Sequence, residues 1–405
     1  MLRVDYHAGR VVLEGSSLLS HLVCPLCGEV YEADAVQTIC QVPACQSSLF
    51  GEYHLSFNLS TDLLEGRPAN MWRYQEFLPV INPQHIVSLG EGFTPILALE
   101  NLKKYAPENT ITWKDESGNP TGSFKARGIS TAISKAKELG IKDIVIPTAG
   151  NAGGALAAYA ARAGINAHVF MPKLTPQLFK DEVRLYGASL IEVEGNISDC
   201  GRLAYGKAVQ QGWFELSTLK EPYRLEGKKT MGYEIAEQSN WELPDVIFYP
   251  TGGGTGLIGI WKAFEELERL GWIGRKRPRM VAVQSSCCDG IAKAFHLHQA
   301  SATYQDAGFT IANGLRVPKP YADKIILNVL YESSGTAISI TDEEMIAAVK
   351  EIARQEGLLV APEGAALWQA FKKLKAQKWI QPGEKVLLLN TGSGYKYLEN
   401  VTSLK

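Results

Sequence analysis

The chain has 405 residues, of which 45% are hydrophobic and 21% are charged, and its formal net charge is -2. A chain of this length and composition is long enough for two or three globular domains. The charge gives no indication of a nucleic-acid partner, and no run of about 18 apolar residues indicates a membrane span. The N-terminus lacks the basic segment and apolar run of a secretory signal, so the sequence predicts a cytoplasmic protein.

Four of the seven cysteines, Cys24, Cys27, Cys40 and Cys45, lie close to the N-terminus. Two thiolate pairs on turns, separated by a short hairpin, are the ligand arrangement of a tetrahedral zinc ribbon. The first pair has the usual spacing of two intervening residues, whereas the second pair has four. The pattern predicts a zinc-ribbon-like extension over residues 1–57 with a structural zinc, and a metal-free remnant is the alternative.

Short apolar strands alternate with helices along the rest of the chain. Such strands, each followed by a helix, are typical of parallel sheets covered on both faces, so the predicted fold class is α/β. The predicted strands are 111–116, 144–147, 167–171, 190–193, 246–249, 280–283 and 386–389. The predicted helices are 129–139, 154–163, 176–186, one that ends near residue 211, 257–270, 343–356 and 365–374. Ligands are expected at the loops that follow the strands.

Lys125 lies after a turn that contains Pro120 and Gly122, at the start of a predicted helix. In the first helical turn the positive end of the peptide dipoles disfavours the ammonium form of a lysine. A lysine with a lowered pKa supplies a neutral amine that condenses with a carbonyl group. Lys125 is therefore a candidate catalytic residue, and a solvated surface lysine is the alternative.

A glycine-rich loop, Pro-Thr-Gly-Gly-Gly-Thr-Gly, occupies residues 250–256 between a predicted strand and a helix. Backbone N–H groups of such a loop, with the helix end, form a cradle for phosphate. No Lys-Ser or Lys-Thr follows, which excludes a P-loop, and the next strand ends in Gln284 where a dinucleotide site needs an acidic residue. A small phosphorylated cofactor is predicted, with a dinucleotide or a structural turn as alternatives. The candidate residues are Gly252, Gly253, Gly254, Thr255 and Gly256.

Three further loops carry polar side chains. One contains Thr148 and Asn151 among glycines and alanines that leave room for a flat ligand, although the asparagine could instead satisfy its own turn. Another, after the last predicted strand, offers the hydroxyl groups of Thr391 and Ser393. A third loop, which includes Arg224, holds the densest cations in the second half of the chain, and a solvated basic turn is its alternative.

Together these motifs resemble the pyridoxal-phosphate enzymes of the tryptophan-synthase-β type, known as fold type II. The segments Asn-Pro-Thr-Gly-Ser-Phe-Lys, Arg-Leu-Glu-Gly-Lys-Lys-Thr and Asn-Thr-Gly-Ser-Gly-Tyr-Lys-Tyr are most similar to those of threonine synthases. That family also includes members with a cysteine-rich N-terminal extension. With the resemblance we expect a large cofactor-binding lobe over residues 58–128 and 224–405, and a smaller, mobile lobe over residues 129–223.

The resemblance implies roles for the cofactor-binding candidates. Lys125 would hold pyridoxal phosphate covalently and would move protons between substrate carbons. The loop over residues 252–256 would bind the cofactor phosphate, and Asn151 would contact the ring hydroxyl. Thr391, with Ser393 in reserve, would face the pyridine nitrogen, and a neutral hydroxyl there makes the ring a weaker electron sink than a carboxylate would.

The implied reaction is that of threonine synthase, a lyase that converts O-phospho-L-homoserine and water to L-threonine and phosphate. Thr148 and Arg224 would bind this small amino-acid substrate, the arginine through an anionic group. The chain departs from the family's pattern at Ala126, where Asp is usual, and around Asn151, where hydroxyl side chains are usual. A serine or threonine dehydratase, or another pyridoxal-phosphate-dependent β-replacement enzyme, is therefore the alternative. We also expect a homodimer, with no nucleic-acid or membrane partner.

Overall fold

The computed structural model describes residues 4–7, 10–13, 17–56, 59–305 and 308–402. The chain divides into two compact units, each built from three separate stretches. The first unit comprises Met1–Phe93, Lys125–Glu234 and Gly259–Arg275, and the second comprises Thr94–Phe124, Ile235–Ile258 and Lys276–Lys405. The predicted lobe boundaries and the mobility of residues 129–223 stay predictions. No helix among the described residues is long and apolar enough to cross a membrane.

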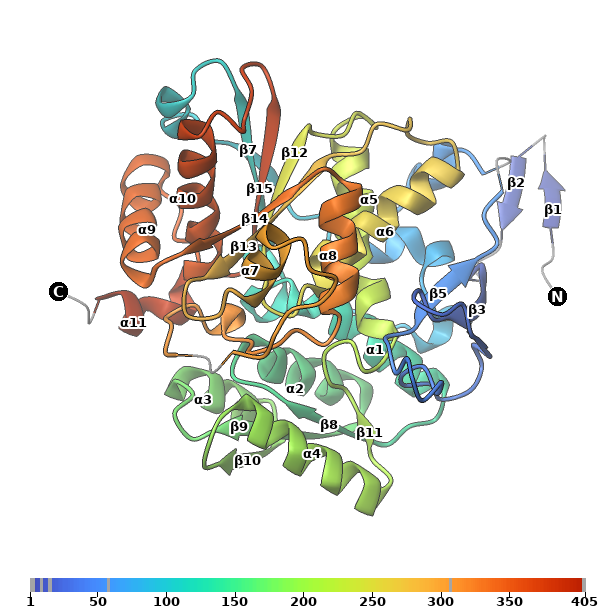
Figure 1. The fold of residues 1–405 in the computed structure, drawn as a ribbon. Helices are drawn as coiled ribbons and strands as arrows, with labels where there is room; N and C mark the ends of the chain where they lie inside the picture. The colour runs from blue at the N-terminus through green and yellow to red at the C-terminus, as the bar shows by residue number, and fades with distance from the viewer. Residues whose placement is uncertain (1–3, 8–9, 14–16, 57–58, 306–307, 403–405) are drawn as a thin grey trace. The chain divides into compact units, whose positions relative to one another are not determined.

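A parallel sheet in the order β10-β9-β8-β11 organises the first unit. Helix α4 packs on one face of this sheet and α2 on the other, and α1 packs against α2 (Figure 1). The strands are β8 (Asp143–Pro147), β9 (Asn166–Pro172), β10 (Ser189–Val193) and β11 (Phe214–Glu215). The helices are α1 (Lys125–Glu138), α2 (Asn151–Ala163), α3 (Gln177–Leu185), α4 (Ile197–Gln211) and α5 (Tyr223–Gln238). Because both sheet faces are covered, the central strands consist mainly of apolar residues.

The N-terminal extension of the first unit contains a small antiparallel sheet in the order β4-β3-β5. Its strands are β3 (Leu19–Val23), β4 (Val30–Tyr31) and β5 (Phe50–Tyr53), and a separate hairpin pairs β1 (Val4–His7) with β2 (Arg10–Leu13). The core of the extension consists of Leu22 and Leu49 packed with two cysteines, Cys24 and Cys40. The cysteines therefore form part of its interior.

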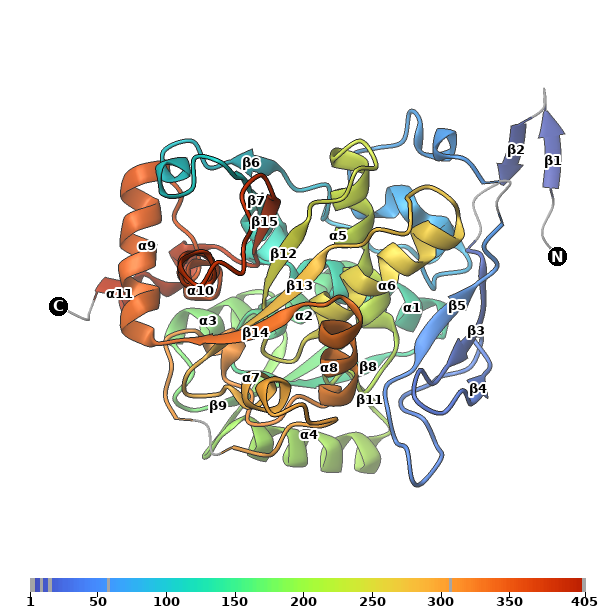
Figure 2. The same ribbon diagram turned by 45° about the horizontal axis from the view of Figure 1, so that its top comes forward.

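A six-stranded sheet in the order β14-β13-β12-β15-β7-β6 organises the second unit, and only β6 is antiparallel to its neighbour. Helix α10 packs across β12, β13, β14 and β15, whereas α7 and α8 cover β13 from the other side (Figure 2). The strands are β6 (Ile96–Ala98), β7 (Thr110–Asp115), β12 (Val246–Pro250), β13 (Arg279–Ser285), β14 (Thr336–Ile340) and β15 (Lys385–Asn390). The helices are α6 (Thr255–Arg269), which begins in this unit, α7 (Gly290–His296), α8 (Asp323–Glu332), α9 (Asp342–Glu356), α10 (Pro362–Ala376) and α11 (Leu398–Thr402).

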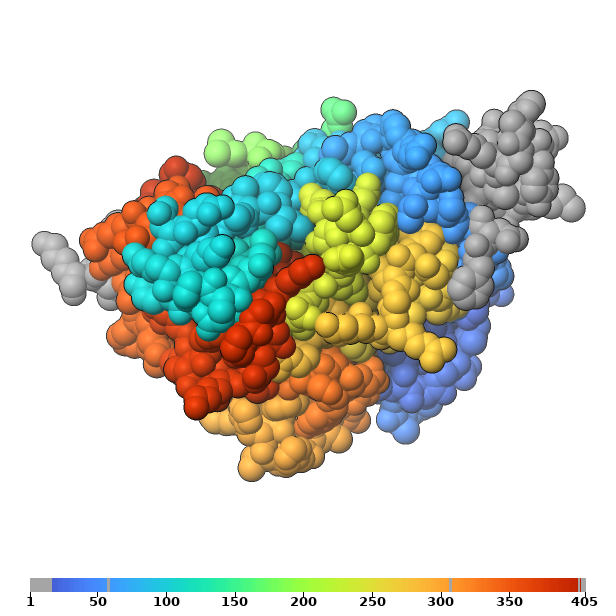
Figure 3. All heavy atoms as spheres, turned by 90° about the horizontal axis from the view of Figure 1, so that it is seen from above, coloured from blue at the N-terminus to red at the C-terminus, as the bar shows by residue number. Residues whose placement is uncertain are grey.

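The segment between β6 and β7 lies beside the turn that precedes β15, and Figure 3 shows the two as adjoining teal and red surfaces. The amide of Asn109 donates to the carbonyl oxygen of Gln381 at 2.7 Å, and the N–H of Gly383 donates to the carbonyl of Glu108 at 3.1 Å. These bonds fix the amino ends of β7 and β15 relative to one another. They therefore help to set the register of the two strands, whose carboxyl ends lead into the loops described below.

The predicted α/β class is confirmed. Every predicted strand and helix is present, and its ends lie within four residues of the predicted ends. The prediction of a loop around Arg224 is wrong, because α5 begins at Tyr223 and continues to Gln238. Arg224 and Lys228 are buried in this helix rather than solvated. A proline directly before the helix, Pro222, is a helix-start signal that the dense charge of the segment obscured.

Helices α1 and α5 approach one another closely at two glycines. A Cβ atom at Gly128 of α1 would lie 2.7 Å from the carbonyl oxygen of Arg224, and one at Gly227 of α5 would overlap the backbone of Arg127. The Arg127 guanidinium binds the Glu234 carboxylate of α5 through two hydrogen bonds of 2.5 and 2.7 Å, with both side chains fully buried. The crossing therefore fixes the first turn of α1 relative to the first turn of α5.

We expect Gly227→Ala to lower the free energy of unfolding by about 2 kcal/mol, because the added methyl group overlaps the α1 backbone in a tightly packed crossing. Gly206→Ala in α4 is the matched control, because nothing lies within 4 Å of its added Cβ, and we expect it to stabilise the protein by about 0.5 kcal/mol. Urea unfolding of the two variants measures both values, and equal effects would contradict a close crossing.

Candidate active site

Three of the loops predicted to bind the cofactor follow adjacent parallel strands of the second unit. Strand β15 pairs in parallel with β12 on one side and with β7 on the other, so their carboxyl ends meet at one edge of the sheet. The glycine loop follows β12, the hydroxyl loop follows β15, and the turn that leads to Lys125 follows β7. Ligands of α/β sheets bind at such an edge.

The turn before Lys125 is bonded directly to the hydroxyl loop. Ser123 pairs as a β-bridge with Gly392, and the backbone N–H of Phe124 donates to the carbonyl of Thr391 at 3.0 Å. The N–H of Ser393 donates to the carbonyl of Gly122 at 2.9 Å. Within the second unit, these bonds hold the turn directly before Lys125 against the hydroxyl loop. The structure thus brings two of the predicted site segments together.

The carboxylates of Asp115 and Glu116 hold the turn before Lys125 through hydrogen bonds. The Asp115 carboxylate accepts from the side-chain amide of Asn390 at 2.7 Å and from the backbone N–H of Ser117 at 3.1 Å. The buried Glu116 carboxylate accepts from the hydroxyl of Thr94 at 2.5 Å and from the amide of Asn119 at 2.8 Å. The bonds tie the ends of β7 and β15 together, so the two loops share one support.

The glycine loop fits an anionic group. A Cβ at Gly252 would overlap the carbonyl oxygen of Gly314, and Gly254 has a φ of +74° and lies against Ile326. Among the described residues, the backbone N–H groups of Gly252, Gly253 and Gly254 donate to no carbonyl oxygen. Helix α6 begins directly after the loop, so free N–H groups and a helix N-terminus converge there, as a phosphate site requires.

In the first unit, Lys125 and Asn151 each occupy the first position of a helix, α1 and α2 respectively. Both residues are half-buried. Thr148 follows β8, and its hydroxyl accepts from the backbone N–H of Gly150 at 3.2 Å, which holds the strand-to-helix turn. A Cβ at Gly153 would lie 2.5 Å from the Met171 side chain, so α2 starts in close contact with β9.

The fully buried Glu91 carboxylate holds α1 and α2 together. It accepts hydrogen bonds from Ser130 of α1 at 2.6 Å, from the Tyr159 hydroxyl of α2 at 2.6 Å and from the Trp72 indole at 2.8 Å. Its negative charge raises the pKa of Tyr159, in addition to the effect of burial. Because one carboxylate receives donors from both helices, the helix starts that carry Lys125 and Asn151 are held in one fixed relation.

Arg224 is held at three points in the first turn of α5. Its guanidinium donates to the carbonyl oxygen of Leu216 at 2.5 Å and to the hydroxyl of Thr218 at 3.1 Å, and its Nε lies 3.7 Å from the Glu221 carboxylate. The side chain is only 2% exposed. Burial lowers the pKa of Arg224, and the nearby Glu221 charge opposes this effect. A rigid, poorly hydrated guanidinium is well suited to bind an anion.

Lys228 lies one turn after Arg224 and is also buried. Burial lowers the pKa of Lys228 well below its usual value, and the charges of Arg224 and Lys125 lower it further. Its Cε atom would be 3.0 Å from a Cβ at Gly128, so the side chain runs along the start of α1. The first unit therefore places the buried side chains of Arg224 and Lys228 near the half-buried Lys125, and an anion bound there would relieve the repulsion between their charges.

The four N-terminal cysteines converge. Their sulfur atoms all lie within 4.8 Å of one another, Cys24 is 3.5 Å from Cys45, and Cys27 is 3.5 Å from Cys40. Disulfides are absent among these cysteines. Zn–S bonds of about 2.3 Å in a tetrahedron require sulfurs roughly 3.8 Å apart, so the donors fit a zinc ion. The hydroxyl of Tyr31 lies 3.4 Å from the Cys40 sulfur and supports its thiolate form.

Comparison with known proteins identifies the family. A family profile described as "Pyridoxal-phosphate dependent enzyme" matches residues 87–392. The chain belongs to this family. The match spans α1, both parallel sheets, the glycine loop and the first part of the hydroxyl loop. It leaves Ser393 and the cysteine-containing extension outside.

Curated relatives of similar length indicate which enzyme of this family the chain is most like. The threonine synthase of Methanocaldococcus jannaschii is 34% identical over 374 residues, which cover 92% of each chain. The threonine synthase of Methanosarcina acetivorans is also 34% identical over 374 residues, 92% of this chain and 91% of that protein. The predicted resemblance is therefore confirmed, and the protein is a threonine synthase-like pyridoxal-phosphate-dependent lyase.

Solved structures share the fold at lower identity. Diaminopropionate ammonia lyase from Escherichia coli superposes with a TM-score of 0.67 at 20% identity and covers 80% of this chain and 91% of that chain. Threonine deaminase isoform 2 from Solanum lycopersicum superposes with a TM-score of 0.65 at 20% identity, covering 84% and 95%. These likenesses confirm the predicted fold type II architecture. The individual roles predicted for the site residues of this pyridoxal-phosphate enzyme stay predictions.

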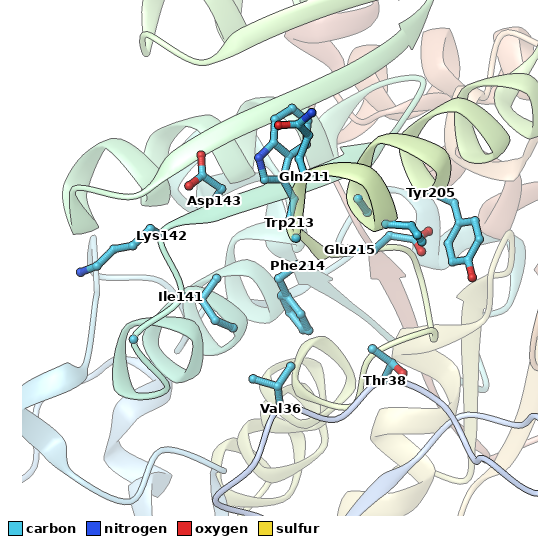
Figure 4. Close-up of a pocket in the computed structure, with 14 residues that line it drawn as sticks. Val36, Thr38, Ile141, Lys142, Asp143, Tyr205, Gln211, Trp213, Phe214 and Glu215 are labelled. Carbon is cyan, nitrogen blue, oxygen red and sulfur yellow. The ribbon is translucent and has the colours of Figure 1, made fainter.

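A separate hollow of 510 Å³ in the first unit contains none of the predicted site residues (Figure 4). Val36 and Thr38 of the extension form one wall, and residues that precede and form β8 and β11 form the other. Its lining is Val36, Thr38, Gly140, Ile141, Lys142, Asp143, Tyr205, Ala208, Val209, Gln211, Gly212, Trp213, Phe214 and Glu215. The hollow is thus distinct from the helix starts that carry the predicted site residues of this unit.

Glu221 is a residue beside Arg224 that the sequence analysis missed. One carboxylate oxygen accepts from the backbone N–H groups of Tyr223 and Arg224 at 2.8 and 3.0 Å, and so caps α5. Burial raises the pKa of Glu221 to about 7, although Arg224 and Lys228 act in the opposite direction. The signal that could have found it is an acidic residue directly before Pro222, at a helix start.

Glu221 should make stability depend on pH. Because its pKa is raised in the folded protein, the folded state binds the proton more tightly, and the resulting stabilisation is lost as the pH rises from 4.5 through about 7. Glu221→Gln removes this titration but keeps an oxygen that caps the helix. The variant should therefore become more stable relative to wild type as the pH rises from 5 to 8. The difference in the free energy of unfolding, variant minus wild type, should increase by on the order of 2 kcal/mol.

The control for this prediction is Glu194→Gln, because the Glu194 side chain is 79% exposed. Thermal or urea unfolding of both variants across the pH range measures the difference. A Glu221→Gln difference that is the same at pH 5 and pH 8 would contradict the raised pKa.

Proposed function

We propose that the protein eliminates phosphate from O-phospho-L-homoserine and adds water to give L-threonine. The observation that carries this proposal is the 34% identity to two threonine synthases across nearly the full length of both partners. The buried cations of Arg224 and Lys228 support it, because the leaving group is a dianion, whereas the hydroxide expelled by a dehydratase has no use for two positive charges.

The residues present fit pyridoxal phosphate. Lys125 would hold the cofactor through its amine, the N–H groups of residues 252–256 would bind its phosphate, and Asn151 would contact its ring hydroxyl. Thr391 would face the pyridine nitrogen; it suits this role better than Ser393, because the Ser393 hydroxyl already accepts from the N–H of Tyr395 at 3.3 Å. The bound cofactor supplies an electron sink that stabilises negative charge on the substrate carbons.

The chain's own residues would move the protons and hold the anions. The Lys125 amine would take a proton from the α-carbon and one from the β-carbon of the substrate, and would return one proton at the γ-carbon and one at the α-carbon. The lowered basicity at the start of α1 is suitable for this role. The carbon–oxygen bond to phosphate breaks at the γ-carbon, and the water oxygen later adds at the β-carbon. Arg224 and Lys228 would bind the phosphate group of the substrate, and Thr148 would contact the substrate.

The test is a substrate panel that measures phosphate and 2-oxo acid release separately. We expect phosphate and threonine from O-phospho-L-homoserine, and Arg224→Ala should lower the rate at low substrate about 100-fold, the effect of losing one charged contact. Arg224→Ala should retain the absorbance of the bound cofactor. Lys125→Ala should lack the covalent, borohydride-reducible link between protein and cofactor.

Arg202→Ala is the matched control, because Arg202 of α4 is 73% exposed and pairs only with its neighbour Asp199 among the described residues. It should behave as wild type. If wild-type protein instead releases 2-oxo acid from serine or threonine and forms no threonine from the phosphorylated substrate, the dehydratase alternative replaces the proposal.

We infer that Cys24, Cys27, Cys40 and Cys45 bind one structural zinc ion. The support is the convergence of four sulfur donors at separations close to those of a tetrahedral site, together with their place in the core of the extension. Four thiolates leave no ligand position for substrate, so the ion would stabilise the extension without a part in the chemistry.

Protein purified without chelator should contain about one zinc ion per chain. Cys40→Ser should lower this content strongly, because three thiolates and a hydroxyl bind zinc less well. Cys200→Ser is the control, because Cys200 is buried in the core of the other part of the first unit with Val145 and Phe170. Elemental analysis decides the question, and equal zinc content in both variants would overturn the site.

We also propose that the enzyme is a cytoplasmic homodimer, as the resemblance implies. The support for the location is the absence of a membrane-spanning helix among the described residues. The support for the dimer is the resemblance alone. Sedimentation of the purified holoenzyme measures the mass of the particle, and a mass of one chain would contradict the dimer.

A further inference from the structure

The N-terminal extension is bonded directly to the segment that seats Arg224. The hydroxyl of Ser48 donates to the carbonyl oxygen of Leu219 at 2.6 Å, and the two residues are 171 positions apart in the chain. Both are 1% exposed. A buried hydrogen bond of this length between two segments so far apart in the chain is a specific link, because both groups would lose their partner in a region that excludes water.

Leu219 has a backbone conformation that needs such support. Its φ is +63°, in the left-handed region that non-glycine residues seldom adopt and that costs on the order of 1 kcal/mol. The residues just before Leu219 provide the seat of Arg224, since the guanidinium donates to the Leu216 carbonyl and to the Thr218 hydroxyl. A relaxed Leu219 would therefore move the oxygen atoms that orient the guanidinium.

The extension also holds the helix that carries Arg224. The Glu226 carboxylate of α5 accepts from the backbone N–H of Gly51 at 2.9 Å and from the Tyr53 hydroxyl at 3.0 Å, both in β5. Glu226 is fully buried and pairs with Lys229 at 2.6 Å and Lys262 at 3.2 Å. The extension thus contacts the chain on both sides of Arg224, five residues before it and two residues after it.

Ser48 is tied in turn to the cysteine cluster. It pairs as a β-bridge with Ile39, and the N–H of Cys40 donates to the carbonyl of Ser47 at 2.8 Å. Leu49 packs in the same core as the cysteines. The position of the Ser48 hydroxyl therefore depends on the fold of the cysteine-containing turns.

Elsewhere the extension stands away from the neighbouring strands. Val36 and Thr38 form one wall of the 510 Å³ hollow, whose opposite wall includes Phe214 and Glu215 of β11, directly before the Arg224 seat (Figure 4). The Ser48 hydrogen bond joins the extension to Leu219 directly, one residue after the Thr218 hydroxyl that accepts from the Arg224 guanidinium.

We propose that Ser48 is a positioning residue for Arg224, and that the cysteine-containing extension serves to hold the substrate-binding arginine. The proposal rests on the proposed function at one point, the assignment of Arg224 to the anionic group of the substrate. Removal of the Ser48 hydroxyl frees the Leu219 carbonyl, lets Leu219 leave its left-handed conformation and disorients the guanidinium, while the cofactor-binding residues keep their own supports.

The test compares holoenzymes of Ser48→Ala and Ser47→Ala. Ser47 is the matched control, because its hydroxyl makes no hydrogen bond among the described residues. Ser48→Ala should raise KM for O-phospho-L-homoserine by about five- to tenfold, the effect of one buried hydrogen bond, with kcat within about twofold of wild type. Cofactor absorbance should not change, and Ser47→Ala should match wild type in every measurement.

Hydrogen exchange without substrate provides a readout that is independent of the reaction. In wild type the Leu216 amide is bonded to Val145 and the Lys220 amide to Ser217. Both amides should exchange faster in Ser48→Ala and in wild type treated with chelator, but not in Ser47→Ala. Unchanged exchange or unchanged KM in Ser48→Ala would overturn the proposal. Failure of the proposed function would instead appear as absent turnover in wild type, with the exchange difference between the two variants intact.

Discussion

The close crossing of α1 and α5 is the constraint on which the catalytic half of the first unit depends. Gly128 and Gly227 remove the side chains that would separate the helices, so the carbonyl of Arg224 comes close to the backbone of α1. Lys125 begins one helix and Arg224 begins the other. The distance between the two helix starts, which carry the residues proposed to hold the cofactor and an anionic group, is thereby set by backbone contact. Such contact is more rigid than any contact between long side chains.

Burial of cations at this crossing has an energetic consequence. Arg224 and Lys228 are within 2% of full burial, and the nearby Glu221 carboxylate is itself driven toward its neutral form by burial. A site with more positive than negative charge in a poorly hydrated region is unfavourable when empty. In the proposed function, a bound dianion would supply the missing charge. The same desolvation that costs stability in the free protein would then favour a phosphorylated substrate.

The sequence predicted the loops at the sheet edge because their positions follow from strand order and local turn chemistry. Gly252 and Gly254 were found from a glycine run after an apolar strand, and the structure shows that each accommodates a close neighbour. Arg224 was found, but its helix was not, because a run of charge was interpreted as a solvated turn. The buried side chain of Lys228 lies beside Gly128 of another helix, and no local pattern reports such a tertiary contact.

The cysteine cluster was predicted from its spacing, but its tertiary contacts were not. The spacing of Cys24 and Cys27 predicts a metal ribbon because two thiolates on one turn must reach one ion. What the ribbon contacts could not be predicted, since Ser48 and Leu219 are brought together only by the folded chain. A left-handed leucine in a seat for arginine is unfavourable by itself, so its persistence requires a bond from outside the segment. The extension provides a bond to Leu219, and through the proposed role of Arg224 this bond would let a module without catalytic groups affect how substrate binds.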